Sequence, residues 1–180
     1  YLISNKIKKI SPKNLNIKSP KETGKTYLAN SKIKANYFYN KTKLVSISDD
    51  SGLSVSCLNG KPGIYSARWA KRHGGFYKAM TFILKKIKKV NKNKKNKNRK
   101  AKFICALAIR INARKMISVE GKVEGLISET IKGNKGFGYD PIFLPKKSRI
   151  TFGEMPHKKK ILLDHRFVAF KKLKKKIKIL

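Results

Sequence analysis

Acidic residues are scarce in this chain. Its 180 residues include 9 aspartates and glutamates against 46 lysines and arginines, which gives a formal net charge of +37. A field of this sign attracts nucleic acid, free nucleotides and anionic lipid. Lysine, asparagine and isoleucine are abundant together, as they are in proteins from AT-rich genomes, so we interpret most lysines as a solvated surface. Nucleic-acid binding is therefore expected to be non-specific at most.

Cysteine and histidine are also rare. The chain has 2 cysteines, Cys57 and Cys105, which are far apart and form no C-x-x-C motif. This spacing argues against a disulfide framework and against a cysteine-based zinc site. The 3 histidines do not pair at the spacing of metal ligands, which argues against a histidine-based zinc site as well.

Long apolar runs are missing. The longest, FICALAI at 103–109, has the length of a strand and falls short of the roughly 20 residues that span a bilayer. No signal peptide is visible at the start of the chain. Because 40% of the residues are hydrophobic, one domain with a sizeable core is expected. These features indicate a cytoplasmic protein without a membrane association.

The spacing of apolar residues predicts alternating helices and strands. Helices are predicted at 26–41, 76–90 and 162–180, and strands at 43–48, 101–111 and 115–128. The last strand is either a strand pair or one long bent strand. Residues 6–10 fit a short strand or the end of a helix, and 53–58 fit a short strand or a turn. The pattern favours a single α/β unit.

Core-facing residues can be assigned on two of these helices because their apolar residues recur at three- and four-residue steps. The expected core residues are Phe76, Met80, Ile83, Leu84 and Ile87 in the first, and Phe167, Phe170, Leu173 and Ile177 in the second. The basic run NKNKKNKNRK at 91–100 follows the first of these helices. It could be a nucleic-acid-binding tail, but an exposed loop between a helix and a strand is favoured.

Asp49 and Asp50 are adjacent carboxylates, placed by this assignment at the end of the strand 43–48. If the pleat of the strand continues, their side chains point to opposite faces. A carboxylate suits Mg²⁺ and can accept a proton from water. The alternative is that Asp-Asp-Ser-Gly is simply a turn, and from these four residues alone the turn is favoured.

Two further clusters carry chemistry. In GNKGFGYDPIF at 133–143, glycines allow close backbone approach while Phe137 and Tyr139 offer flat faces for a nucleobase. Taken alone, such a loop is more often structural. Lys160, His165 and Arg166 supply cations and hydrogen-bond donors for phosphate or for a base carbonyl. Carboxylate, aromatic ring and cation together are typical of a nucleotide-processing site.

The motifs SDDSGLSV with LNGKPGIYSARWA, GFGYDPIF, TFGEM and KKILLDHRFVAFKKL resemble the inosine triphosphate pyrophosphatase family, whose members are also called dITP/XTP pyrophosphatases. They occur in the family's order over residues 22–173. The resemblance implies hydrolysis of non-canonical purine triphosphates such as ITP, dITP and XTP to the monophosphate and pyrophosphate. It also implies an α/β fold with a long twisted mixed central sheet flanked by helices, two lobes with an active-site cleft between them, Mg²⁺ as cofactor, and a homodimer.

Roles for individual residues follow from the same resemblance. Asp50 matches the residue that binds Mg²⁺ and acts as the base on the attacking water, and Glu22 matches a second acidic group near the metal. His165 and Arg166 match the pair that recognises a 6-keto purine. The positions that match substrate-binding residues are Ser51, Phe137, Gly138, Tyr139, Asp140, Lys160, His165 and Arg166.

The start of the chain departs from the family pattern. Asn5 and Lys8 have the N-x-x-K spacing of the family's phosphate loop, but Ile3 stands where that loop has serine or threonine. The distance to Glu22 is also too short for the family's first helix. We therefore expect 1–180 to be a single pyrophosphatase domain that lacks the N-terminal strand, the phosphate loop and the first helix. Two alternatives stay open: a basic nucleic-acid-binding protein, and a truncated, inactive member of the family.

Overall fold

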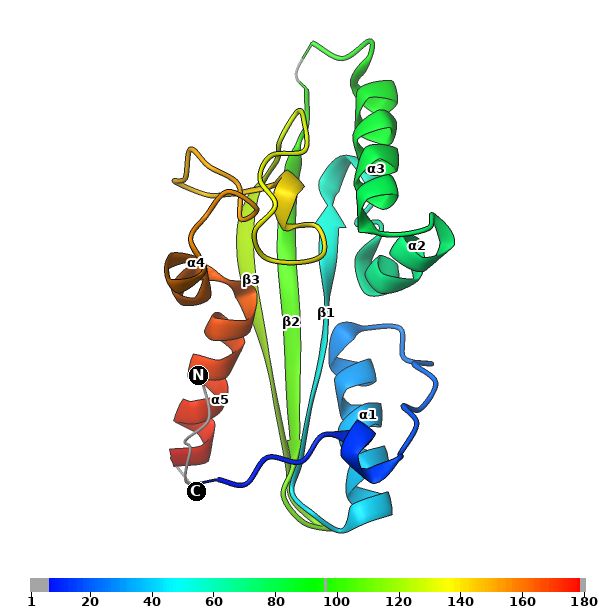
Figure 1. Ribbon diagram of the computed structural model, residues 1–180, viewed down its shortest axis with the longest axis vertical. Helices are drawn as coiled ribbons and strands as arrows, with labels where there is room; N and C mark the ends of the chain where they lie inside the picture. Colours follow the sequence, from blue (N-terminus) through cyan, green and yellow to red (C-terminus); the bar gives the residue numbers. More distant parts are fainter. Residues whose placement is uncertain (1–6, 96, 179–180) are drawn as a thin grey trace.

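The computed structural model describes residues 7–95 and 97–178 and contains one sheet with helices around it (Figure 1). The strands are β1 (Ser46–Val55), β2 (Lys100–Arg110), β3 (Met116–Ile127) and β4 (Phe143–Pro145). The helices are α1 (Tyr27–Thr42), α2 (Ser66–Arg72), α3 (Phe76–Asn91), α4 (His157–Leu163) and α5 (His165–Lys178). The strand order is β1-β2-β3-β4, so β1 lies at one edge.

The strand pairs of the described residues are all antiparallel, whereas the resemblance implied a mixed sheet. The reason lies in the connections. After β1, helix α3 leads away from the end of the sheet, and the chain returns from the far end of α3 directly into β2 (Figure 1). A hairpin then joins β2 to β3. The basic run 91–100 joins α3 to β2, as the favoured interpretation had it: Asn91 ends α3, Lys100 begins β2, and the described residues between them are exposed or half-buried.

The prediction that a strand ends at the two aspartates is wrong. The runs 43–48 and 53–58 were expected to be separate, but β1 passes through Asp49 and Asp50 without a break and ends at Val55. Pairing with β2 along its whole length stabilises the polar stretch as strand. The alternative of a turn at these residues is therefore wrong too, while β3 shows that 115–128 is one long strand.

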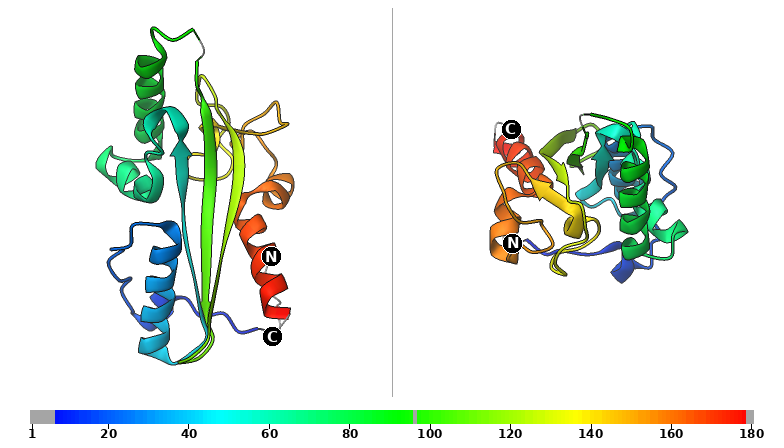
Figure 2. Two further views of the ribbon diagram at one scale, coloured as in Figure 1. Left: turned by 180° about the vertical axis from the view of Figure 1, so that it is seen from behind. Right: turned by 90° about the horizontal axis from the view of Figure 1, so that it is seen from above.

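Helices α1 and α5 cover opposite faces of the sheet. Tyr27 of α1 packs with Ile104 and Ala106 of β2. On the other face, Ala169 and Leu173 of α5 pack with residues of β2 and β3. Figure 2 shows the sheet between α1 and α5 from two further directions. The largest core lies between α3, one end of the sheet and the segment around β4.

The core faces of the helices follow the sequence with two exceptions. In α3, Met80, Ile83 and Ile87 are buried, but Phe76 is 40% exposed. In the C-terminal helix, Ile177 is 40% exposed, contrary to the prediction that it faces the core. This helix is also broken. The predicted helix 162–180 is interrupted at Asp164, whose carboxylate accepts a hydrogen bond from the Phe167 amide at 2.8 Å and caps α5.

The N-terminal segment contributes little regular structure. Residues 7–10 form neither the strand nor the helix end that was predicted for 6–10, and the next element is a 3₁₀ turn at Pro12–Leu15. Asn5 lies outside the described residues. Over the described ranges, no helix combines the length and apolarity needed to cross a membrane.

Candidate functional site

Asp49 and Asp50 point to opposite faces of the sheet, as strand geometry predicts. Asp50 faces α1, where it is 7% exposed and contacts Asn30 and Lys34. Asp49 faces α5, where it forms an ion pair of 3.3 Å with Arg166. The two neighbours therefore belong to different clusters of side chains, which meet at β1.

The first cluster, which we call the carboxylate cluster, consists of Glu22, Asn30, Lys34, Asp50 and Arg68. Lys34 Nζ lies 2.7 Å from Glu22 Oε1 and 3.3 Å from Asp50 Oδ1. Arg68 Nη2 lies 3.5 Å from the other carboxylate oxygen of Glu22. The family resemblance implied that Glu22 and Asp50 lie near the same metal, and both carboxylates form ion pairs with the ammonium group of Lys34.

Burial and charge act against each other in this cluster. Burial raises the pKa of the Asp50 carboxyl, and the Lys34 charge and the Asn30 hydrogen bond offset this only in part. For Lys34, burial alone would lower the pKa, but the hydrogen bond to Glu22 and the nearby Asp50 charge outweigh it and leave the pKa raised. Lys34 is therefore a persistent cation between two carboxylates.

The same donor set suits a divalent metal. Within residues 7–95 and 97–178, no three histidine, cysteine or acidic side chains lie together as a metal-binding group. Magnesium does not need such a group, because it is commonly held by one or two carboxylates together with waters and substrate phosphates. Glu22 and Asp50 already share one cation, the Lys34 ammonium, so these two carboxylates fit Mg²⁺ in exchange for that ammonium.

The second cluster, the ring cluster, surrounds the Phe137 side chain. Lys160 Nζ lies 4.5 Å and Arg166 Cζ 4.8 Å from the centre of the Phe137 ring. Because the ring is still 56% exposed, another aromatic group has access to it. Phe137 is thus brought together with Lys160 and Arg166 from a later part of the chain, and His165 contacts Arg166.

Lys160 is held by a buried ion pair. Its Nζ lies 2.7 Å from Asp140 Oδ2, and the two side chains are 4% and 2% exposed. The same Asp140 oxygen accepts the Phe137 amide hydrogen at 2.7 Å. Gly136 has a φ of +78°, and a Cβ there would lie 2.2 Å from Asp140 Oδ2, so only glycine fits this close approach. Asp140 therefore shapes the loop that presents Phe137.

The remaining predicted residues have other contacts. Ser51 donates a hydrogen bond to Asp49 Oδ2 at 2.9 Å, which places it on the α5 face with the ring cluster. The Tyr139 hydroxyl is buried and donates to the Ser66 carbonyl oxygen at 2.9 Å. Gly138 has a φ of +66° and lies next to Phe76. Tyr139 and Gly138 thus anchor the Phe137 loop through contacts with Ser66 and Phe76.

His165 is buried and stacks on Phe103, with ring centres 4.8 Å apart. Its Nε2 lies 3.1 Å from Arg166 Nη1. A guanidinium only donates, so Nε2 is the acceptor and the proton of the neutral ring is on Nδ1. Burial, followed by the charges of Arg166 and Lys160, lowers the pKa of His165 to about 3. Within the described part of the chain, Nδ1 has no hydrogen-bond partner, which leaves an unsatisfied donor.

The neutral state of His165 predicts acid sensitivity. In the folded state its pKa is about 3 and its ordinary value is 6.5, so between these pH values the unfolded chain binds a proton that the folded chain does not. His165 therefore makes the fold less stable as the pH falls. Relative to His165→Phe, the wild type should lose about 2–3 kcal/mol between pH 6.5 and 4.5, measured by urea unfolding at both pH values. Parallel curves for the two proteins would contradict this assignment.

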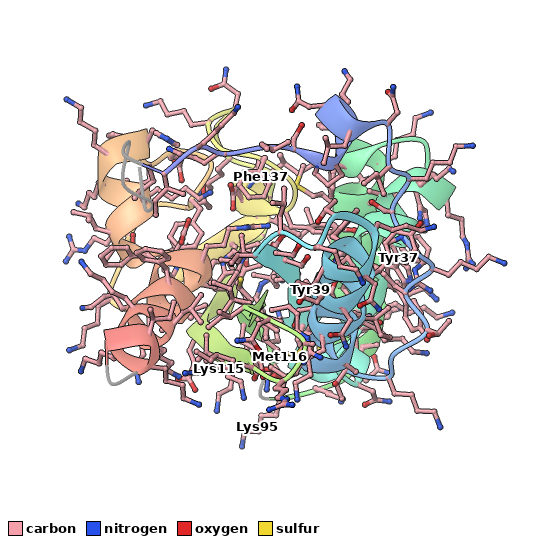
Figure 3. The ribbon with its side chains drawn as sticks, turned by 90° about the horizontal axis from the view of Figure 1, so that it is seen from below. Tyr37, Tyr39, Lys95, Lys115, Met116 and Phe137 are labelled. Carbon is pink, nitrogen blue, oxygen red and sulfur yellow. The ribbon has the colours of Figure 1, made fainter. Side chains whose placement is uncertain are left out.

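A shallow cavity of about 500 Å³ lies elsewhere, at the hairpin between β2 and β3. Its lining residues are Tyr39, Asn112, Ala113, Arg114 and Lys115. Figure 3 shows Tyr39 and Lys115 at this end of the molecule. None of the predicted site residues lines it, so this cavity is separate from the two clusters.

Sequence reasoning missed Lys34, Asn30 and Arg68. Asn30 and Lys34 are spaced by four residues and share one face of α1, downstream of Thr26, whose side chain accepts a hydrogen bond from the Ala29 amide and caps the helix. A helix whose inward face carries asparagine and lysine has a weak apolar pattern. That weakness could have indicated a polar, functional face.

Three kinds of comparison bear on this geometry. The family model described as Ham1 family matches residues 2–176. A dITP/XTP pyrophosphatase of Bacillus licheniformis is 43% identical over 152 residues, which cover 84% of this chain and 76% of the relative. One of Caulobacter vibrioides is 38% identical over 173 residues, covering 96% of this chain and 87% of the relative.

Solved structures agree. A HAM1 protein from Coxiella burnetii superimposes with a TM-score of 0.84 at 29% identity, covering 93% of this chain and 84% of that one. A nucleoside-triphosphatase (dITP/XTP pyrophosphatase) from Mycobacterium abscessus gives a TM-score of 0.71 at 35% identity, covering 87% and 78%. The resemblance seen in the sequence motifs is confirmed, and the chain belongs to the Ham1 family.

Proposed function

We propose that this protein hydrolyses non-canonical purine nucleoside triphosphates such as ITP, dITP and XTP to the monophosphate and pyrophosphate. The observation that carries the proposal is the division of two adjacent aspartates between a carboxylate cluster and a ring cluster. A nucleotide has the same two-part chemistry, with an anionic triphosphate at one end and an aromatic base at the other. The relatives named dITP/XTP pyrophosphatases support the reaction.

The base would stack on Phe137, and the triphosphate would reach the carboxylate cluster across β1. Because β1 carries both aspartates and is the edge strand of the described sheet, the two clusters lie on either side of one edge of the sheet. Arg166 is held toward the ring cluster by Asp49 and offers charge near the base. Family membership also supports the finer expectations that the two clusters face a cleft between two lobes and that the chain forms a homodimer.

Glu22 and Asp50 would hold Mg²⁺, which when bound neutralises triphosphate charge and acidifies a bound water. Asp50 has one contact to each carboxylate oxygen, Lys34 on Oδ1 and Asn30 on Oδ2. A carboxylate has about four lone-pair sites, so Asp50 keeps capacity to accept a proton from the attacking water. Lys34 and Arg68 add positive charge where the triphosphate would lie.

A neutral His165 would favour keto purines over adenine. If the bound base reaches the buried Nδ1–H, its 6-keto oxygen, in hypoxanthine or xanthine, would supply the missing acceptor. The 6-amino group of adenine would place a donor against this donor and leave both unpaired. Discrimination based on an unpaired buried polar group reaches factors of about 10⁴ in favourable cases.

Pyrophosphate release tests the proposal. The protein should release pyrophosphate from ITP, dITP and XTP in the presence of Mg²⁺ and should be at least about 10²-fold slower on ATP. An equal rate on ATP would contradict the assigned recognition of the keto group. No release from any of the nucleotides would overturn the proposed function.

A further inference from the structure

We propose that Asn30 is a positioning residue that fixes the separation of Glu22 and Asp50, so that the two carboxylates face the same cation. The inference rests on the proposed function in taking these two residues as the metal-binding pair. It concerns a side chain whose amide oxygen and nitrogen each have a partner within the protein, so that it acts on the metal through the two carboxylates.

The side-chain amide of Asn30 joins two parts of the chain that carry the carboxylates. Its Oδ1 accepts the backbone amide hydrogen of Gly24 at 2.8 Å, two residues after Glu22. Its Nδ2 donates to Asp50 Oδ2 at 3.2 Å. Reversing the amide would set its NH₂ against the Gly24 N–H and its carbonyl against the carboxylate, so the partners fix the orientation. Asn30 is 0% exposed, so water does not compete for either bond.

Packing makes this link rigid. A Cβ on Gly24 would lie 2.7 Å from both Ala29 Cβ and Asn30 Oδ1, so the segment after Glu22 lies directly against α1 and only glycine fits there. Asp50 is fixed independently by its place in β1. Asn30 thus spans two rigid supports, and the position of the Glu22 segment relative to β1 depends on it.

Lys34 also joins Glu22 to Asp50, but in a different way. Its link is an ammonium charge between the carboxylates, which a divalent cation at the same place would repel. The amide of Asn30 is neutral and contacts Asp50 through the oxygen that Lys34 does not use. It can therefore hold the pair both before and after a metal binds, which is what a positioning residue must do.

Binding of Mn²⁺ alone, measured by electron paramagnetic resonance on the full chain without nucleotide, tests the inference. Asn30→Leu and Asn30→Ser should each weaken Mn²⁺ binding by about 10-fold or more, the usual effect of losing a residue that orients a metal ligand. The matched control is Ser31→Ala. Ser31 is equally buried in α1, and its hydroxyl donates to the Leu28 carbonyl oxygen at 3.0 Å, outside the cluster, so affinity should change less than about 2-fold.

A double variant separates positioning from general damage. In a Glu22→Gln background the pair is already lost, so Asn30→Leu should cost only about 3-fold or less in Mn²⁺ affinity. An undiminished loss there, or wild-type affinity in a folded Asn30 variant, would overturn the proposal. A wild type that binds no Mn²⁺ would also overturn it. So would the failure of both Asn30 variants to fold, because Asn30 would then be a structural residue.

Hydrolysis of ITP, followed in parallel, keeps the two proposals apart. If Mn²⁺ binding depends on Asn30 but no nucleotide is hydrolysed, the positioning role stands and the proposed function fails. If ITP is hydrolysed but neither Asn30 variant changes Mn²⁺ affinity, the function stands and the positioning role fails.

Discussion

Asp50→Asn should abolish pyrophosphate release from ITP, with a loss of about 10³-fold or more in kcat, while the fold is retained. The amide has almost the same shape as the carboxylate and can still contact Lys34, but it neither accepts a proton from water nor binds a divalent cation strongly. A base from solvent would not restore the lost proton acceptor, because position 50 is buried and Asp50 is only 7% exposed. Initial rates at saturating ITP and Mg²⁺ measure the effect, and circular dichroism establishes that the variant is folded.

Asp49→Asn is the matched control, because the change is the same and the position is adjacent. Asp49 is on the other face of β1, and its contact with Arg166 joins side chains that are 44% and 34% exposed. A pair this exposed contributes about 1 kcal/mol or less. We expect kcat to change less than about 5-fold, with a modest rise in KM as Arg166 loses its ion pair. Equal losses of kcat in both variants would refute the separate roles of the two carboxylates.

The contrast between these neighbours also shows how far the sequence could be interpreted. Alternation along a strand predicted that Asp49 and Asp50 face opposite ways, and this is confirmed by Arg166 on one side and Lys34 on the other. The strand itself was wrongly ended at the aspartates, because a polar stretch of Ser, Asp and Gly has a low strand propensity. Pairing with the apolar β2 overrides that local preference.

Long-range partners were harder to predict. The motifs indicated Glu22 and Asp50, but Lys34 is one of 46 basic residues, and composition alone gave no reason to select it. Only the fold places its ammonium 2.7 Å from Glu22. Likewise, Lys160 was interpreted as an available cation, and nothing local in the sequence shows that it is buried against Asp140.

The burial of Lys160 has a large energetic consequence. An exposed lysine in this chain contributes little to stability, but Lys160 has 4% of its side chain exposed and faces a carboxylate that is 2% exposed. Burial raises the pKa of the Asp140 carboxyl, and the hydrogen bonds from Lys160 and from the Phe137 amide counter that effect. Removing Lys160 alone would therefore leave a carboxylate in an apolar setting without its counter-charge.

Lys160→Met should destabilise the fold by about 3–5 kcal/mol, which for a domain of this size lowers the melting temperature by about 6–20 °C. Methionine has a similar length, so the loss reports the unpaired charge more than a cavity. The double variant Lys160→Met with Asp140→Asn should recover most of the loss. Asparagine keeps an acceptor for the Phe137 amide, and no uncompensated charge remains.

Thermal unfolding of the single and double variants tests whether the unpaired charge causes the loss of stability. Lys159→Met, at an exposed position, is the control. If the double variant is no more stable than Lys160→Met alone, the unpaired Asp140 charge is not the cause of the lost stability. Recovery of stability also bears on the site, because Asp140 shapes the loop that carries Phe137. A recovered fold with weakened ITP binding would show that the Lys160–Asp140 pair, whose ammonium lies 4.5 Å from the Phe137 ring centre, contributes to ITP binding as well as to the fold.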